Sequence, residues 1–240
     1  GLRSPLQEIS FDDVRGLRCN VYTDALTLGK QSEECSISST WLNDEVIDLY
    51  VKLVAAKFSQ SPTAAGRPGP SLCYSSHFLT RLLNRPTNLA EGVGHYDYSG
   101  VRGFSRRAPN RDIYKLDKLL FPFNPNGVHW TCIMVSFPEK RVTLYDSWHH
   151  TGADVARAAA VADFWLAAVH RYLQDAWTDK HPRAPTPNWH LEVWPRTPKQ
   201  ENSYDCGVYV CHFVEHLLRA LPLDVSGQAI TNLRTWIAWS

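Results

Sequence analysis

The stretch PKQENSYDCGVYVCHFVEHLL occupies residues 198–218 and joins two patterns that decide how this part of the chain folds. Its first half is polar and opens with Pro198, which is typical of a loop. Its second half carries apolar residues three or four positions apart, which predicts a helix that continues to residue 221. Asp205 is a good N-cap residue, so we expect the helix to begin at Cys206.

A thiol at position 206 would lie where helical hydrogen bonding leaves backbone N–H groups free and where the helix dipole is positive. Both features favour the thiolate, which is the form in which a cysteine acts as a nucleophile. The alternative is that Cys206 is a small buried residue without chemistry, as free cysteines usually are. The rest of the chain has to decide between these two interpretations.

Composition narrows the class of protein. The chain has 240 residues, of which 44% are hydrophobic and 20% charged, and this predicts one domain spanning residues 1–240. Lys and Arg number 25 against 24 Asp and Glu, so the balance gives no support to a nucleic acid or an anionic membrane as partner. No apolar run reaches the roughly 18 residues that would indicate a membrane span. Residues 1–5 lack an apolar signal core, and we expect the chain to be excised from a larger protein.

The cysteines do not form a recognisable metal or disulfide pattern. There are six, at positions 19, 35, 73, 132, 206 and 211, with no C-x-x-C pair and no zinc-finger spacing to histidine. This pattern therefore gives no indication of a zinc site. A chain of this size needs no disulfide scaffold, so free thiols in the nucleus or cytoplasm are expected rather than secretion.

The remaining patterns predict helices around a central sheet. Residues 44–58 form an amphipathic pattern that Asn43 or Asp44 would cap. Strands are predicted at 72–74, 118–123, 128–137, 141–146 and 189–194, and further helices at 77–83, 152–177 and 227–239. Residues 84–110 are rich in glycine and arginine and are predicted as a long exposed loop, either a solvated one or one that meets an acidic protein surface.

The predicted hairpin over residues 128–146 brings candidate catalytic groups together. Its turn near residue 139 places His129, at the start of one strand, close to Asp146, at the end of the next. His129 could act as base and acid for Cys206, Asp146 could orient the imidazole, and Gln200 could donate to a developing oxyanion. From the residues alone, the catalytic and the inert interpretations of Cys206 both stay open. Four other histidines compete for the role and are interpreted as surface or helix-face residues: His149, His150, His212 and His216.

Four motifs in order along residues 41–220 resemble the ubiquitin-like-protein proteases, the Ulp and sentrin-specific cysteine proteases. They are WLND at 41–44, VHW at 128–130, YDS at 145–147 and PKQENSYDCG at 198–207. The resemblance implies an α+β fold with a mixed central sheet flanked by helices, as in papain-like cysteine proteases. It also implies that neither a metal nor an organic cofactor is needed. It implies Cys206 as nucleophile, His129 as base and acid, Asp146 as the residue that orients it, and Gln200 in the oxyanion hole.

The same resemblance implies how a substrate would bind. Trp41 and Trp130 would form a narrow slot over the C-terminal Gly-Gly of a modifier, because two flat indoles can clamp glycines while any side chain would collide. Asn43 and Asp44 would belong to the same substrate-binding surface. The alternative for Trp41 is a hydrophobic staple onto the helix that follows it.

The implied activity is that of a monomeric cysteine isopeptidase and peptidase acting on a ubiquitin-like modifier and its conjugates, with SUMO favoured. A deneddylase is the nearest alternative, because residues 21–26 and 202–207 also resemble that group; a deubiquitinase matches less well. An acyltransferase on this scaffold would need a basic phosphate cradle, which the sequence does not show. A module that only binds the modifier is disfavoured, because all four catalytic residue types are present. Residues 84–110 and the 60-residue interval between Asp146 and Cys206 match no particular subfamily.

Overall fold

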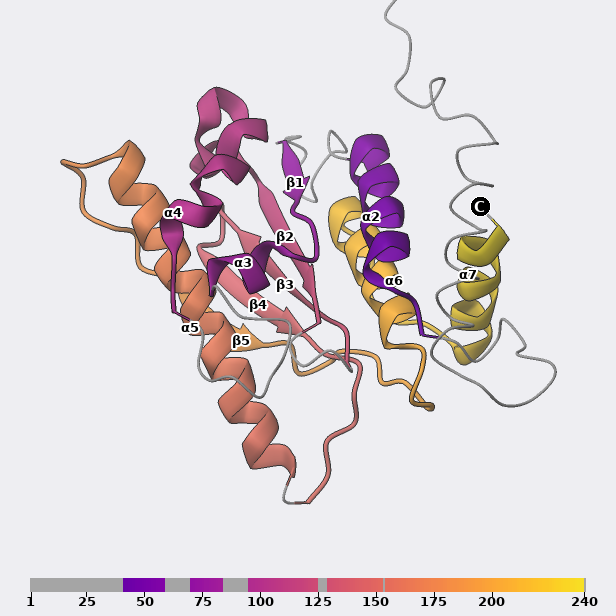
Figure 1. The fold of residues 1–240 in the computed structure, drawn as a ribbon. Coiled ribbons are helices and arrows are strands. Elements are labelled where there is room, and N and C mark those ends of the chain that lie inside the picture. The colour runs from indigo at the N-terminus through magenta and orange to yellow at the C-terminus, as the bar shows by residue number, and fades with distance from the viewer. Residues whose placement is uncertain (1–40, 59–69, 84–94, 125–128, 153, 240) are drawn as a thin grey trace, which may run out of the picture.

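A computed structural model describes residues 41–58, 70–83, 95–124, 129–152 and 154–239. Its centre is a five-stranded mixed sheet in which the strands follow one another in sequence order (Figure 1). The outer strands pair in parallel, β1 with β2 and β4 with β5, while β2, β3 and β4 are antiparallel. The predicted α+β architecture is thereby confirmed. The strands are β1 (Ser71–Cys73), β2 (Lys118–Phe123), β3 (Thr131–Ser136), β4 (Arg141–Tyr145) and β5 (His190–Val193).

Helices cover both faces of the sheet and create two separate cores (Figure 1). On one face lie α2 (Asp44–Phe58) and α6 (Cys206–Arg219), with α7 (Gly227–Trp239) packed outside them. On the other face lie α3 (Phe78–Leu82), α4 (Tyr98–Val101) and the long α5 (Asp154–Lys180). Alternate strand residues point to opposite faces, so Ile133 joins the α5 core while its neighbours Cys132 and Met134 join the α6 core.

The predicted hairpin of β3 and β4 is present. Cys132 pairs with Tyr145, so His129 lies two residues before β3 begins and Asp146 directly follows the last residue of β4. The predicted cap of α2 is also present, because the Asn43 Oδ1 accepts a hydrogen bond of 3.0 Å from the Val46 N–H. β3 is buried along its whole length, as its continuous apolar sequence indicates.

The predicted loop over residues 84–110 is wrong where the structure describes it. From residue 98 onward the chain forms α4 and three short 3₁₀ helices at Arg102–Arg107, Pro109–Arg111 and Ile113–Lys115. Asp97 and Asp112 accept backbone hydrogen bonds at two of these helix starts. Helices this short leave no longer-range periodicity in the sequence, so their glycine and arginine content resembles that of a loop.

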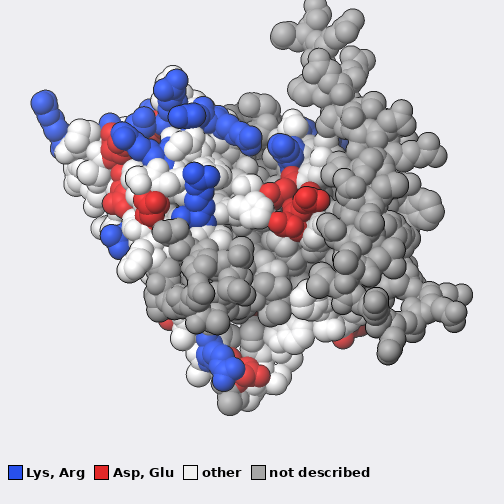
Figure 2. Space-filling model, viewed as in Figure 1, with Lys and Arg blue, Asp and Glu red and all other residues white. Residues whose placement is uncertain are grey.

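Basic side chains gather on the surface over these short helices (Figure 2). Arg102 nevertheless pairs with Asp179 of α5, with its Nε 3.2 Å from the Asp179 Oδ2, so part of this charge is compensated within the fold. Residues 84–94 lie outside the described part of the chain, as do residues 21–26, which carry part of the resemblance to deneddylases. None of the helices in the described ranges combines the length and apolar composition that crossing a membrane requires.

Gly207 marks the contact between the start of α6 and the start of α2, and it generates a first prediction. A methyl group at this position would lie 3.0 Å from the Leu42 Cβ and 3.1 Å from the Cδ1 of Ile47, which is fully buried. We expect Gly207→Ala to lower the free energy of unfolding in urea by about 1–3 kcal/mol, the usual cost of overpacking. Gly227→Ala is the matched control, because no atom lies within 4 Å of its added methyl. Equal stability of the two variants would show that α2 and α6 are not held at this distance.

Candidate active site

The three predicted catalytic side chains meet at one end of the sheet. The His129 Nε2 lies 2.7 Å from the Asp146 Oδ1, and the two side chains are only 18% and 16% exposed. Cys206 is the first residue of α6, is 1% exposed, and lies close enough to His129 for its side chain to raise the pKa of that imidazole. Because Nε2 is taken by Asp146, Nδ1 is the ring nitrogen left for the thiol. This is the arrangement that nucleophilic attack by a cysteine requires: nucleophile, base, and a group that orients the base.

The surroundings of His129 favour its charged form. Burial alone would lower its pKa, but the hydrogen bonds and charges of Asp146 and Cys206 outweigh burial and raise the pKa from 6.5 to about 9. Burial alone would raise the pKa of Asp146. The hydrogen bond and charge of His129, together with hydrogen bonds from His150 and the Trp148 N–H, outweigh burial and lower this pKa from 3.8 to about 2. At neutral pH the site therefore holds an imidazolium beside a carboxylate.

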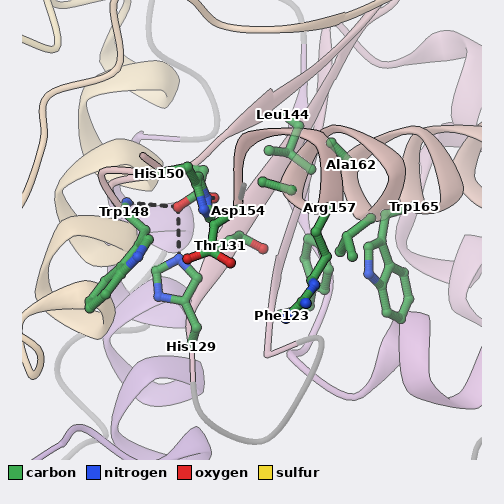
Figure 3. A pocket seen from close by; sticks show the side chains of 13 residues that line it. Phe123, His129, Thr131, Leu144, Trp148, His150, Asp154, Arg157, Ala162 and Trp165 are labelled. Atoms are coloured by element: carbon green, nitrogen blue, oxygen red, sulfur yellow. Dashed lines mark hydrogen bonds and ion pairs between the residues drawn. The ribbon is translucent and has the colours of Figure 1, made fainter. Parts of the chain in front are cut away.

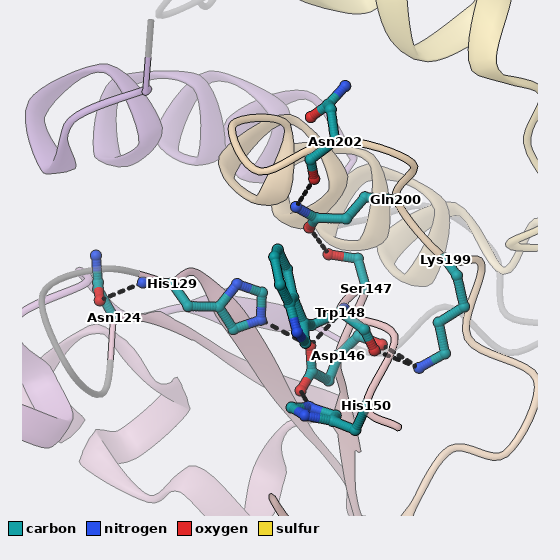
Figure 4. Close-up of polar contacts among 9 residues, drawn as sticks. All are labelled: Asn124, His129, Asp146, Ser147, Trp148, His150, Lys199, Gln200 and Asn202. Atoms are coloured by element: carbon teal, nitrogen blue, oxygen red, sulfur yellow. Dashed lines mark hydrogen bonds and ion pairs between the residues drawn. The ribbon is translucent and has the colours of Figure 1, made fainter. Parts of the chain in front are cut away.

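His150 is a member of this site that the sequence interpretation missed. Its Nε2 lies 3.0 Å from the Asp146 Oδ2, while the Trp148 N–H donates to Oδ1 at 2.8 Å (Figure 4). The interpretation of His150 as a surface residue is thus wrong, and that of His212 is incomplete, because His212 lies on α6 but is buried there. His149 is exposed, as predicted. The three bonds fix the plane of the Asp146 carboxylate toward His129.

Gln200 is buried and held by the segment that follows β4 (Figure 4). Its Oε1 accepts a 2.7 Å hydrogen bond from the Ser147 hydroxyl, and its backbone N–H donates to the Ser147 carbonyl at 2.8 Å. Its amide nitrogen donates to the Asn202 carbonyl at 2.6 Å. A primary amide carries two N–H donors, so one remains for an oxyanion. Lys199 adds two further bonds, from its Nζ to the carbonyls of Asp146 and Trp148.

Asp205 occupies the predicted N-cap position of α6, but its side chain does not cap the helix. Its two carboxylate oxygens instead accept from the Arg234 Nε at 2.6 Å and from the Asn202 Nδ2 at 2.7 Å. Arg234 comes from α7, and its Nη2 also donates to the Tyr204 carbonyl at 2.7 Å. A buried ion pair therefore clamps the loop that leads into Cys206. The sequence patterns could not predict this ion pair, because Arg234 lies 29 residues after Asp205 in the sequence.

The four predicted substrate-binding residues all lie near the start of α2 or against the segment before it, but they differ in exposure and contacts. Trp130 is buried beside Gly207, and its indole N–H donates to the Leu42 carbonyl at 3.0 Å, so it holds the segment before α2. Trp41 is 48% exposed, and it is Leu42 that packs against the α6 core, which argues against Trp41 as a staple. Asn43 caps α2, and Asp44 pairs with His77 at 3.1 Å on the surface.

Among the described residues, no three His, Cys, Asp or Glu side chains are arranged to hold a metal ion. The Cys206 thiol beside His129 can carry out acyl transfer.

The comparison with known proteins agrees with this geometry. The model of the Ulp1 protease family, C-terminal catalytic domain, matches residues 40–239. The chain belongs to the Ulp1 protease family. It is therefore a cysteine protease domain, and its Ulp1-family membership agrees with the resemblance that its four motifs showed.

Relatives of this Ulp1-family domain share about a quarter of its residues. The ubiquitin-like-specific protease ESD4 of Arabidopsis thaliana is 25% identical over 203 residues, covering 84% of this chain and 37% of its own length. The ubiquitin-like-specific protease 1 of Saccharomyces cerevisiae is 27% identical over 199 residues, covering 82% of this chain. The chain spans only 27% of the length of that yeast relative.

Solved structures show the same fold. The SUMO protease Ulp1 with its catalytic cysteine oxidised to a sulfinic acid superposes with a TM-score of 0.64 at 26% identity, covering 83% of this chain and 76% of that one. The C-terminal Ulp1 protease domain in complex with Smt3, the yeast ortholog of SUMO, gives 0.62 at 25% identity, covering 83% and 75%.

The Asp146–His129 pair predicts a change in pH dependence. We expect kcat/KM of the wild type to fall as pH rises through about 9, where His129 loses its proton. Asp146→Asn removes the charge that holds this proton, so the pKa of His129 falls and the alkaline limb moves to lower pH by about 1–3 units. Measuring kcat/KM between pH 5 and 10 on both proteins tests this. If the alkaline limb lay at the same pH in the wild type and in Asp146→Asn, Asp146 would not control the pKa of His129.

His150 and His149 form a natural matched pair of variants. His150→Ala removes one hydrogen bond from the Asp146 carboxylate and should lower kcat/KM by about 2- to 10-fold, the equivalent of one net hydrogen bond. His149→Ala should leave kcat/KM unchanged, because His149 is exposed. A loss of equal size in both variants would mean that the loop, and not the bond to Asp146, matters.

Proposed function

We propose that this domain cleaves the bond after the C-terminal Gly-Gly of a ubiquitin-like modifier, with SUMO as the preferred modifier. It would release the modifier from lysine side chains and mature its precursor. The observation that carries the proposal is the His129–Asp146 hydrogen bond of 2.7 Å, which lies beside Cys206 at the start of a buried helix. The fold of the domain also supports the proposal, because the Ulp1 domain bound to Smt3 has the same fold and is 25% identical.

The mechanism follows from the contacts. The Cys206 thiolate, paired with the His129 imidazolium, attacks the last carbonyl of the modifier. Gln200 donates its second amide N–H to the oxyanion that forms, and its position is fixed by Ser147. The imidazolium gives its proton to the leaving amine, and neutral His129 then removes a proton from the water that hydrolyses the thioester. Asp146 keeps the imidazole in the tautomer that both steps need.

The proposed slot for the Gly-Gly tail would lie beside the nucleophile. Trp130 borders the position after Cys206, since its Cδ1 lies 3.5 Å from the point that a methyl group on Gly207 would occupy, and its bond to Leu42 holds it rigidly. Trp41 is exposed next to Leu42 and is free to cover the tail from the other side. Asn43 and Asp44 at the start of α2 would border the same path.

SUMO is preferred over the neddylation modifier because the complex with a similar fold contains Smt3. A deneddylase stays the second candidate on the strength of residues 202–207, whose Asn202 and Asp205 organise the loop before the nucleophile. We further propose that the domain acts as a monomer in the nucleus or cytoplasm. Its four described cysteines are free thiols, as a reducing compartment would keep them.

A panel of modifiers that carry a C-terminal electrophile tests the proposal directly. We expect SUMO to form a covalent adduct with the wild type, detected by intact mass, and Cys206→Ala to form none and to lose all cleavage. Cys211→Ala is the matched control, because Cys211 is equally buried on the same helix yet has no catalytic role. Preferential labelling by the neddylation modifier would select the second candidate. Labelling of Cys206→Ala would remove Cys206 as the nucleophile.

Trp41 offers a test of the slot that avoids the core. We expect the wild type to cleave a modifier ending in Gly-Gly far faster than one ending in Gly-Ala, because a methyl group would meet an indole. Trp41→Ala should keep its melting temperature, since Trp41 is half exposed, yet lose activity on Gly-Gly and discriminate less against alanine. An undiminished preference for Gly-Gly in Trp41→Ala would exclude Trp41 from the slot.

A further inference from the structure

A pocket lies beside His129 on the α5 side of the sheet (Figure 3). One wall consists of His129, Trp148 and His150, which follow or precede the central strands, and the other consists of the first turns of α5. Its floor is apolar and belongs to the α5 core, whereas Cys206 belongs to the core on the opposite face. The floor residues are Phe123, Leu144, Val161, Ala162 and Trp165.

The pocket has the volume to hold one large side chain and an apolar floor to receive it, and Asp146, Asp154 and Arg157 also line it. Its volume is about 240 Å³. An apolar cavity of about 150 Å³ is enough to bind benzene, so a leucine, methionine or phenylalanine side chain would fit. The rings of Phe123 and Trp165, with centroids 4.9 Å apart, make the floor rigid.

Its position relative to the reaction identifies what would enter it. His129 must hand a proton to the leaving nitrogen, so the chain on the leaving side has to pass within hydrogen-bond reach of the imidazole. The modifier tail approaches along Trp130 and α2, on the α6 face of the sheet. The chain that leaves therefore departs past His129 toward the α5 face, where the pocket opens.

One polar atom at the pocket is without a partner. Thr131 lines the pocket and is 5% exposed, and in the described part of the chain nothing hydrogen-bonds to its hydroxyl oxygen. A buried hydroxyl left unpaired costs free energy. This oxygen is closed off from solvent, so the apolar floor, and not the hydroxyl, would provide the contact with a bound chain.

We infer that this pocket binds an apolar side chain of the leaving polypeptide, within two residues of the scissile bond. In a precursor this is a residue that follows Gly-Gly, and in a conjugate it is a neighbour of the modified lysine. The inference rests on the proposed function. It makes the target sequence, and not only the modifier, a determinant of cleavage.

The experiment uses fusions in which SUMO Gly-Gly is followed by Leu-Leu or by Ser-Ser, together with SUMO Gly-Gly methyl ester, whose leaving group is methanol. We expect wild type to cleave the Leu-Leu fusion about tenfold faster in kcat/KM, the effect of burying one large apolar side chain. Ala158→Phe should fill the pocket and bring this ratio close to one. Ala159→Phe is the matched control, because Ala159 is exposed on the same helix outside the pocket. The methyl ester should be hydrolysed equally by all three proteins.

The outcomes separate the inference from the proposed function. Equal cleavage of the two fusions by wild type, or an unchanged ratio in Ala158→Phe, overturns the pocket while leaving the protease in place. A ratio lost in both Phe variants overturns it as well, because the effect would then belong to α5 as a whole. Failure of wild type to hydrolyse the methyl ester or either fusion removes the proposed function, and the inference falls with it. Ala158→Leu repeats the test with a smaller side chain if Ala158→Phe melts early.

Discussion

A seam of hydrogen bonds between residues 146–148 and residues 199–200, buried at Ser147 and Gln200, holds this candidate active site together. It joins the end of β4, which carries Asp146, to the loop that carries Gln200 and leads to the nucleophile. Neither segment is regular secondary structure, so without the seam Asp146 and Gln200 would move independently. Because Ser147 and Gln200 are both buried, breaking a bond between them leaves polar groups without water.

The rest of the fold positions the two sides of this seam. The β3–β4 hairpin brings His129 to Asp146 through strand register alone. α6 brings Cys206 to the same edge, and its close contact with α2 at Gly207 sets the depth at which the nucleophile sits. His129 thus stands at the boundary between the two cores of the protein, with the nucleophile on one face and an apolar pocket on the other.

Sequence patterns predicted what depends on neighbouring residues. The apolar run of β3 and the turn after it predicted that His129 and Asp146 lie close together, and the helical spacing predicted a helix that begins at Cys206. Only the family resemblance joined Cys206 to that pair. Sequence patterns failed where a side chain bonds to a residue that is distant in the sequence, or where a helix is very short. Asp205 has the residue type of a helix cap, yet Arg234 of α7 competes successfully for its carboxylate. His150 reaches Asp146 only because of the path that the chain takes after β4, and no periodicity reports that path.

The Asp205–Arg234 ion pair can form only late in the synthesis of this domain. A polypeptide is synthesised from its amino end, so the nucleophile loop emerges from the ribosome 29 residues before the arginine that anchors it. Until Arg234 has been added, Asp205 has no cationic partner from α7, and the loop before Cys206 lacks this ion pair. A nascent chain therefore contains Cys206, His129 and Asp146 before it contains the arginine that anchors the loop leading to Cys206.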